Sequence, residues 1–300
     1  MHARPRRRLA ATILVVVPAL VLVGCASAAH SPSASEGAPP LSPSTGATPA
    51  PKASRAPVIP DRVNALMAVG RAGNADLEVI EATSGHTFLT FPIGAPDASW
   101  GHILSAAADG DSTMVRNDVL ESAESSRRLR IDGQWRLPTI GRDPIPSGRS
   151  ADGSTLVLVE PRTGADSGSP TSSRFAVVRA PIPPSVAPLE LARIIELPGA
   201  FDFDALSANG SILYVIEHLD DGAGGAYQVR SVDVASGRMD AVPVANKSDI
   251  DETMAGQPIT QQRQSDGMVY TLYRGSEHPF VHALSSNDKW AICIDLPATG

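Results

Sequence analysis

The sequence is poor in cysteine: only Cys25 and Cys293 occur among 300 residues. A small secreted fold held together by several disulfides is therefore excluded, because such folds need more cysteines. Positive charge is also scarce, since the formal net charge is −7 at pH 7. An acidic chain argues against binding to nucleic acid and against electrostatic docking on anionic lipid headgroups.

Long amphipathic helical periodicity is missing as well. Only the stretch 188–197 has a helical pattern, and the run IIEL within it suits a strand equally well. The sequence has no glycine-rich phosphate loop, no zinc-type cysteine or histidine pair and no Gly-x-Ser-x-Gly elbow. A Ser-His-Asp triad stays open, because its members can be scattered along any chain.

The first residues carry export signals. Four arginines precede the apolar run 9–23, which is too short to span a bilayer comfortably. The run ends in Leu22-Val23-Gly24-Cys25, which resembles the lipobox of bacterial lipoproteins. This resemblance implies that residues 1–24 are a signal peptide and that Cys25 carries the lipid. Residues 6–9 also fit a weak twin-arginine signal, so the export route stays open between the Sec and Tat systems.

Residues 25–57 form the expected link between the lipid and a folded domain. They are rich in Ser, Ala and Pro, and their composition is typical of a disordered tether. A folded domain is then expected over residues 58–300. We expect the chain to be a monomer on the extracytoplasmic face of the cell membrane, with the lipid anchor as its only membrane contact. Cys293 lies in an apolar strand-like run and is expected to be a buried, inert thiol.

Two kinds of turn recur in the remaining chain. Asn-Gly and Asp-Gly pairs precede apolar runs, and these pairs suit tight hairpin turns because both residues tolerate positive φ. The intervals between them, about 40 to 60 residues, match the length of a β-propeller blade. The pairs are Asp109-Gly110, Asp152-Gly153, Asn209-Gly210 and Asp266-Gly267. The second turn recurs in IEATSG at 80–85 and VDVASG at 232–237.

These signals predict an all-β fold, a β-propeller of four-stranded antiparallel blades with about five blades visible. Strands at this spacing also suit a sandwich, but the repeated turn favours the propeller. The first blade is expected to have three strands, at 66–69, 77–82 and 87–93. The others are expected to have four each, at 103–107, 113–117, 128–131 and 134–137; at 145–150, 155–160, 174–179 and 191–197; at 201–207, 212–217, 228–233 and 239–244; and at 259–264, 269–273, 280–284 and 291–296.

The stretches LSANGSILYVIE at 206–217 and QSDGMVYTLY at 264–273 carry a family resemblance. They resemble the Ser-x-Asp-Gly core of bacterial secreted propellers, the broad seven-bladed group with lactonase-type and quinoprotein-dehydrogenase-type (WD40-like) repeats. The resemblance covers about residues 65–296. It implies the scaffold and no particular activity, because this fold carries many unrelated functions. Neither a tryptophan pattern for a quinone nor an acidic ring for a lactonase metal is present.

The number of strands leaves one question open. The first blade lacks an innermost strand, and the sequence stops at Gly300 just after the fifth blade. Either five blades close imperfectly, or the sequence is a shortened version of a longer chain. We prefer the second interpretation, in which the visible blades belong to a larger ring.

Six residues are candidates for chemistry. Glu217-His218 and Glu277-His278 each follow the second strand of a blade at a similar repeat phase. Paired Glu and His side chains can bind a divalent cation or act as general acid and base, but two unrelated solvated loops explain them as well. Asp202 and Asp204 lie two residues apart in one strand, so both are expected on one face.

Acidic loop tips provide no better site. Those at 109–111, 220–222 and 249–252 do not complete a calcium-loop spacing. We assign no catalytic residue and no cofactor, although calcium or another divalent cation at the six candidates stays open. The sequence therefore favours a non-enzymatic module that recognises an envelope protein or a cell-wall glycan through loops such as 222–225 and 163–173. The alternative is a metal-assisted hydrolase or lyase with its site in the central channel.

Overall fold

A computed structural model describes most of the chain after residue 65. The described residues are 66–70, 76–81, 83–98, 101–119, 127–143, 145–161, 172–182, 185, 187–219, 225–245, 253–264, 266–275 and 277–297. The predicted signal peptide, Cys25 and the tether lie outside these residues. Within the described part, no helix is long and apolar enough to cross a membrane.

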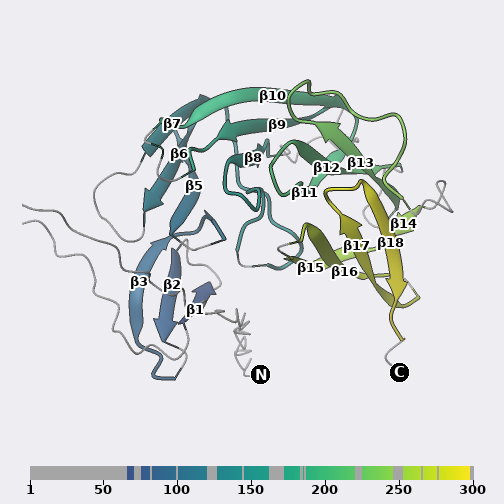
Figure 1. The fold of residues 1–300 in the computed structure, drawn as a ribbon, viewed down its shortest axis with the longest axis horizontal. Coiled ribbons are helices and arrows are strands. Elements are labelled where there is room, and N and C mark those ends of the chain that lie inside the picture. Colours follow the sequence, from purple (N-terminus) through teal and green to yellow (C-terminus); the bar gives the residue numbers. More distant parts are fainter. Residues whose placement is uncertain are drawn as a thin grey trace, which may run out of the picture.

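The described strands form five antiparallel sheets that follow one another around an arc (Figure 1). The described part of the chain therefore has the β-propeller fold, with five blades visible, as the repeated turns predict. The first blade contains β1 (Leu66–Gly70), β2 (Asp76–Glu81) and β3 (Thr87–Pro92). The second contains β4 (Ala95–Pro96), β5 (His102–Asp109), β6 (Ser112–Val119) and β7 (Arg127–Asp132). The third contains β8 (Thr155–Val159), β9 (Ser172–Arg179) and β10 (Glu190–Pro198). The fourth contains β11 (Phe201–Leu206), β12 (Ile212–His218), β13 (Ala226–Asp233) and β14 (Met254–Ala255). The fifth contains β15 (Gln257–Arg263), β16 (Met268–Arg274), β17 (Pro279–Ser285) and β18 (Trp290–Asp295).

The turn that precedes β12 shows why its sequence is repeated. The side chain of Ser207 accepts the N–H of Ile212 at 2.9 Å, and the side chain of Asn209 accepts the N–H of Ser211 at 3.0 Å. Gly210 has a φ of 66°, which favours glycine. The turn before β8 has the same bonds, because Ser150 accepts the N–H of Thr155 and Asp152 accepts that of Ser154. Side-chain oxygens thus fix both hairpins.

The second repeated turn is also confirmed. The N–H of Gly85 donates to the carbonyl of Glu81 at 2.8 Å, and that of Gly237 donates to Asp233 at 2.7 Å. Both glycines have positive φ, 68° and 72°. The turn at 237 leaves the third strand of its blade, β13. By the same phase, β1, β2 and β3 correspond to the second, third and fourth strands of a blade.

The predicted second blade is shifted by one strand. The pair Asp109-Gly110 joins β5 and β6, the second and third strands, whereas the other three pairs precede second strands. The first strand of this blade is the short β4, and the fourth is β7. Residues 134–137, predicted as the fourth strand, belong instead to the next blade, because Arg136 forms a bridge with Val159 of β8.

Two other predicted strands are largely replaced by isolated bridges. In the third blade, 145–150 contributes only the bridge from Arg149 to Leu156. In the fourth, 239–244 contributes only bridges from Met239 and Val244, and β14 pairs with the first two residues of β13 instead. Edge segments such as these have few pairing partners, so their sequence pattern specifies a regular strand weakly.

The core lies between neighbouring blades. One buried cluster joins the second and third blades through residues such as Leu104 and Leu158. Another joins the third and fourth through Phe175 and Phe203, and a third cluster joins the fourth and fifth. The last cluster includes Tyr214, Tyr227 and Tyr273, so most of the tyrosines of this aromatic-poor chain lie at one junction. The third and fourth blades are thus each packed between two neighbours.

Candidate functional site

Consecutive strands in each blade are antiparallel, so their connections alternate between two faces of the ring. We call the face with the turns 97–101, 150–155, 207–212 and 264–268 the turn face. The opposite face includes the connections 218–226 and 275–279, and we call it the loop face. The third and fourth blades meet at the turn face, where the N–H of Asp152 donates to the carbonyl of Ala208 at 3.0 Å.

On the loop face, the candidates of the fourth blade form separate pairs. His218 Nε2 lies 2.7 Å from Asp202 Oδ2, and the Asp202 side chain is 51% exposed. The Glu217 carboxylate accepts a hydrogen bond from Arg230 at 2.5 Å and another from Gln228 at 3.0 Å. Glu217 is therefore neutralised by an arginine on the neighbouring strand and does not face His218.

The candidates of the fifth blade form another separate pair. His278 Nε2 lies 2.9 Å from Asp295 Oδ1 at the end of β18, and Glu277 is exposed. In the described part of the chain, no three His, Cys, Asp or Glu side chains gather closely enough to hold a metal ion. The six predicted residues are thus distributed over two blades and do not form a single group.

Asp204 differs from the other candidates because it is buried. Its side chain is 1% exposed, and it lies where the register of β11 against β12 shifts between Phe203 and Ala205. The shift inserts one extra residue and disrupts the alternation of the strand, as a β-bulge does. Oδ1 of Asp204 lies 3.4 Å from Nε2 of Gln261, and Oδ2 has no hydrogen-bond partner among the described residues.

Burial controls the ionisation of this carboxyl group. Desolvation raises the pKa of Asp204 to about 7, although the nearby positive charge of Arg263 acts in the opposite direction. The buried hydroxyls of Tyr214, Tyr227 and Tyr273 also have raised pKa values, so they stay protonated beside it. Near neutral pH, the Asp204 carboxyl group is therefore protonated in some molecules and ionised in others.

Asp204 belongs to a polar network in the middle of the ring. The side-chain amide of Gln261 donates to the backbone carbonyl of Asp204 and to the hydroxyl of Thr271, each at 3.0 Å. Arg263 donates to the carbonyl of Arg149 at 2.6 Å. The Arg149 side chain is 7% exposed and donates to the carbonyl of His102 at 2.8 Å. The network thus links residues of the second, third, fourth and fifth blades.

The connection between β7 and β8 also crosses this region. It runs from the second blade into the middle of the arc, near β15 (Figure 1). The N–H of Arg142 donates to the carbonyl of Ile259 at 2.9 Å. The Asp143 carboxylate accepts the Thr260 hydroxyl at 2.5 Å and the Gln261 N–H at 2.8 Å. A segment of the chain is therefore bound across the inner strand of the fifth blade.

Replacing Asp143 with alanine is expected to destabilise the fold by about 2 kcal/mol, because it removes two charge-assisted hydrogen bonds and leaves a backbone N–H without its acceptor. Urea unfolding measures this change. The matched control is Arg142→Ala, which keeps the backbone bond to Ile259 and should change stability by less than about 0.5 kcal/mol. Equal losses in the two variants would contradict a specific role for the Asp143 carboxylate.

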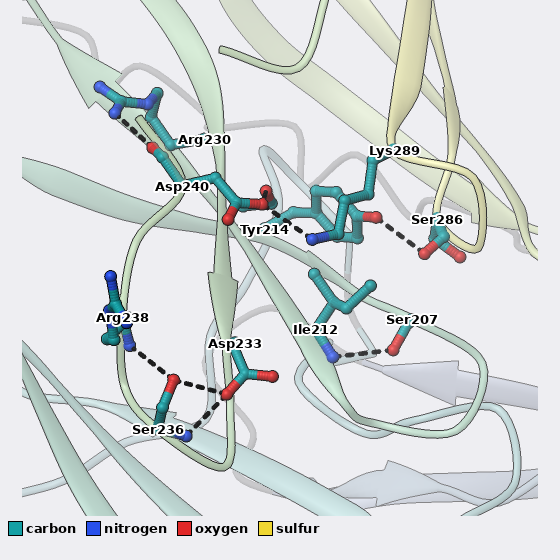
Figure 2. A network of polar contacts seen from close by, with 11 residues as sticks. Ser207, Ile212, Tyr214, Arg230, Asp233, Ser236, Arg238, Asp240, Ser286 and Lys289 are labelled. Atoms are coloured by element: carbon teal, nitrogen blue, oxygen red, sulfur yellow. Dashed lines mark hydrogen bonds and ion pairs between the residues drawn. The ribbon is translucent and has the colours of Figure 1, made fainter. Parts of the chain in front are cut away.

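A second network joins the fourth and fifth blades near the turn face (Figure 2). The hydroxyl of Tyr214 donates to the carbonyl of Ser286 at 2.8 Å. The ammonium of Lys289 lies 2.7 Å from the carboxylate of Asp240, which also accepts the hydroxyl of Ser231 at 2.6 Å. These bonds hold the pKa of Asp240 below its usual value. The network is a structural tie between two blades, because each polar group already has a partner.

Sequence reasoning missed a buried polar row across the fifth blade. The strand registers place Gln261, Thr271, His282 and Cys293 opposite one another on β15, β16, β17 and β18. Thr271 and His282 are 1% and 2% exposed. Desolvation lowers the pKa of His282 to about 4, so its ring is neutral near pH 7. The signal in the sequence was a polar residue within the apolar runs of β16 and β17, and its meaning depends on the strand register.

Comparison with known proteins gives no family assignment. No protein-family model matches the chain, and no curated protein matches it. Solved structures with a similar shape include TolB from Acinetobacter baumannii, at 11% identity and a TM-score of 0.42, covering 78% of this chain and 52% of that one. They also include prolyl oligopeptidase B from Galerina marginata (12%, TM-score 0.43, 77% and 32%) and a puromycin hydrolase (13%, TM-score 0.40, 80% and 37%). The chain thus spans about half or less of the length of these proteins.

Proposed function

We propose that the chain is a lipid-anchored, extracytoplasmic β-propeller that recognises an envelope protein or a cell-wall glycan and catalyses no reaction. In this proposal Cys25 carries the lipid and residues 25–57 hold the propeller away from the membrane. The lipobox-like sequence and the Ser/Ala/Pro-rich composition support this part. The propeller then presents one of its two faces to the partner.

The observation that carries the proposal is the segment bound across the middle of the ring. Arg142 and Asp143 bond to β15, and the Arg149–Arg263 bond adds a link beside them. A catalytic centre in the channel needs free, converging polar side chains around a substrate-sized space. Here many polar groups at the centre already bond to other parts of the same chain. This arrangement favours recognition of a partner by the surface of the propeller.

The loop face is the better recognition surface. The connections between second and third strands lie there, and that from β16 to β17 carries the exposed side chain of Glu277. Leu219 begins one of these connections, at the point where its N–H bonds to Ala226, and its side chain is 44% exposed. The predicted contact loops 163–173 and 222–225 lie mostly outside the described residues.

Site-specific photo-cross-linking in intact cells tests the proposal. A photoreactive residue replaces Leu219 or Glu277 on the loop face, and Ala98, an exposed residue on the turn face, serves as the matched position. We expect a discrete adduct from the first two positions and none from the third. A Cys25→Ser variant should leave the membrane fraction and lose the adduct. Equal adducts at all three positions, or none, would contradict recognition by the loop face.

A further inference from the structure

A small pocket between the fourth and fifth blades contains a thiol, a thioether and an imidazole side chain. Cys293 and His282 line it from β18 and β17, and Met254 lines it from β14. His282 and Cys293 are directly opposite each other in an antiparallel pair, so their side chains project from the same face of the blade at neighbouring positions. Met254 comes from the opposing blade, so the pocket exists only where the two blades meet.

The imidazole of His282 gives the main evidence that the pocket binds a ligand. Its side chain is 2% exposed, and Nδ1 has no hydrogen-bond partner among the described residues. An unsatisfied buried polar atom costs about 1 to 3 kcal/mol, so native structures rarely retain one without a compensating role. A lone pair on a ring nitrogen beside a thiol and a thioether is well suited to bind a metal ion.

The type of donor selects the type of ion. Thiolate and thioether sulfur favour soft ions such as Cu(I), whereas calcium and magnesium require several oxygen ligands. The described lining of the pocket contains no carboxylate, and its other members include the apolar residues Val229 and Val244. One thiolate neutralises a monovalent ion, whereas a divalent ion would leave a net positive charge in an apolar pocket.

We propose that Cys293, His282 and Met254 form a binding site for Cu(I). The Cys293 thiol loses its proton to solvent as the sulfur–copper bond forms, and no electron is transferred. Cys293 is half-buried and therefore provides the route from solvent, whereas His282 and Met254 are buried. The site lies at a junction of blades and is separate from the loop face, so it does not depend on the recognition role.

Competition with a chromophoric Cu(I) chelator, under anaerobic conditions, tests the site. The protein is the full chain in detergent with Cys25→Ser, so that Cys293 is its only cysteine. We expect one tightly bound Cu(I) for each chain and an X-ray absorption spectrum with sulfur and nitrogen donors. Cys293→Ser should abolish the tight site, and Met254→Leu should weaken it by at least about tenfold.

Met268→Leu is the matched control, because Met268 is a half-buried methionine of β16 that does not line the pocket. It should bind Cu(I) as tightly as its parent does. Leucine preserves the volume of methionine, so both variants should keep the fold, which thermal unfolding verifies. Unchanged affinity after Cys293→Ser or Met254→Leu, a spectrum without sulfur donors, or preferential binding of Zn(II) would overturn the proposal.

Discussion

Asp204→Asn is expected to make the folded chain more stable at pH 8, by on the order of 4 kcal/mol if the full pKa shift is expressed. In the native state this carboxyl group is 1% exposed, and its pKa is raised from 3.8 to about 7. At pH 8 it is ionised in both the folded and the unfolded chain, but only the folded chain bears the cost of a buried charge. Asparagine has a similar shape and no charge.

The sign of the pH dependence follows from the raised pKa. Between about pH 4 and 7 the folded state binds a proton that the unfolded state does not, so protonation of Asp204 stabilises the fold as the pH falls. The advantage of Asp204→Asn over the wild type should therefore shrink as the pH falls through 7 and be nearly lost near pH 4. Arg263 is the charged group that faces this carboxyl, and the neighbouring tyrosines stay neutral.

His282 changes the total pH profile in the opposite direction. Its pKa is lowered to about 4, so the unfolded chain binds a proton between about pH 6.5 and 4 and stability is lost as the pH falls. For this reason the measurement is the difference between wild type and variant in urea unfolding at several pH values.

Asp202→Asn in the same strand is the control, and its exposed pair with His218 should contribute less than about 1 kcal/mol. If the difference in unfolding free energy between wild type and Asp204→Asn does not vary with pH, the raised pKa of Asp204 is refuted.

The turn chemistry explains how much of the fold was predictable. Ser207, Asn209 and Gly210 determine a hairpin through local bonds, and the same residue types repeat at other blades, so local sequence was sufficient. The second blade was misplaced by one strand because Asp109-Gly110 looks like these turns but joins different strands. Its first strand, β4, has only two residues, and so short a strand leaves no periodic pattern.

The candidate site was less predictable, because its properties arise from contacts between distant segments. Asp204 was recognised as a candidate, but its burial depends on the bulge in β11 and on Gln261 from another blade. Glu217 and His218 adjoin in sequence, yet each bonds to a different neighbour. The donors of the pocket come from β14, β17 and β18, and only the packing of two blades brings Met254 to His282.

Gly210→Ala is expected to destabilise the chain by about 3 kcal/mol or more, because two separate costs combine at this turn. Gly210 has a φ of 66°, a conformation that strains any residue with a Cβ atom. An added Cβ would also clash with Oγ1 and Cβ of Thr155 in the neighbouring blade. Thr155 cannot move aside easily, since it is fully buried and its hydroxyl accepts a hydrogen bond from Arg179 at 2.8 Å.

Gly110→Ala separates the two costs. Gly110 has nearly the same φ, 63°, but no atom lies within 4 Å of an added Cβ. It should therefore lose only the energy of the strained backbone, about 1 to 2 kcal/mol. Chemical denaturation of the two variants gives the difference, which measures the contact between the turn of the fourth blade and the first residue of β8. Similar losses at both glycines would mean that the third and fourth blades do not pack through this turn, and the arrangement of the ring at this junction would have to be revised.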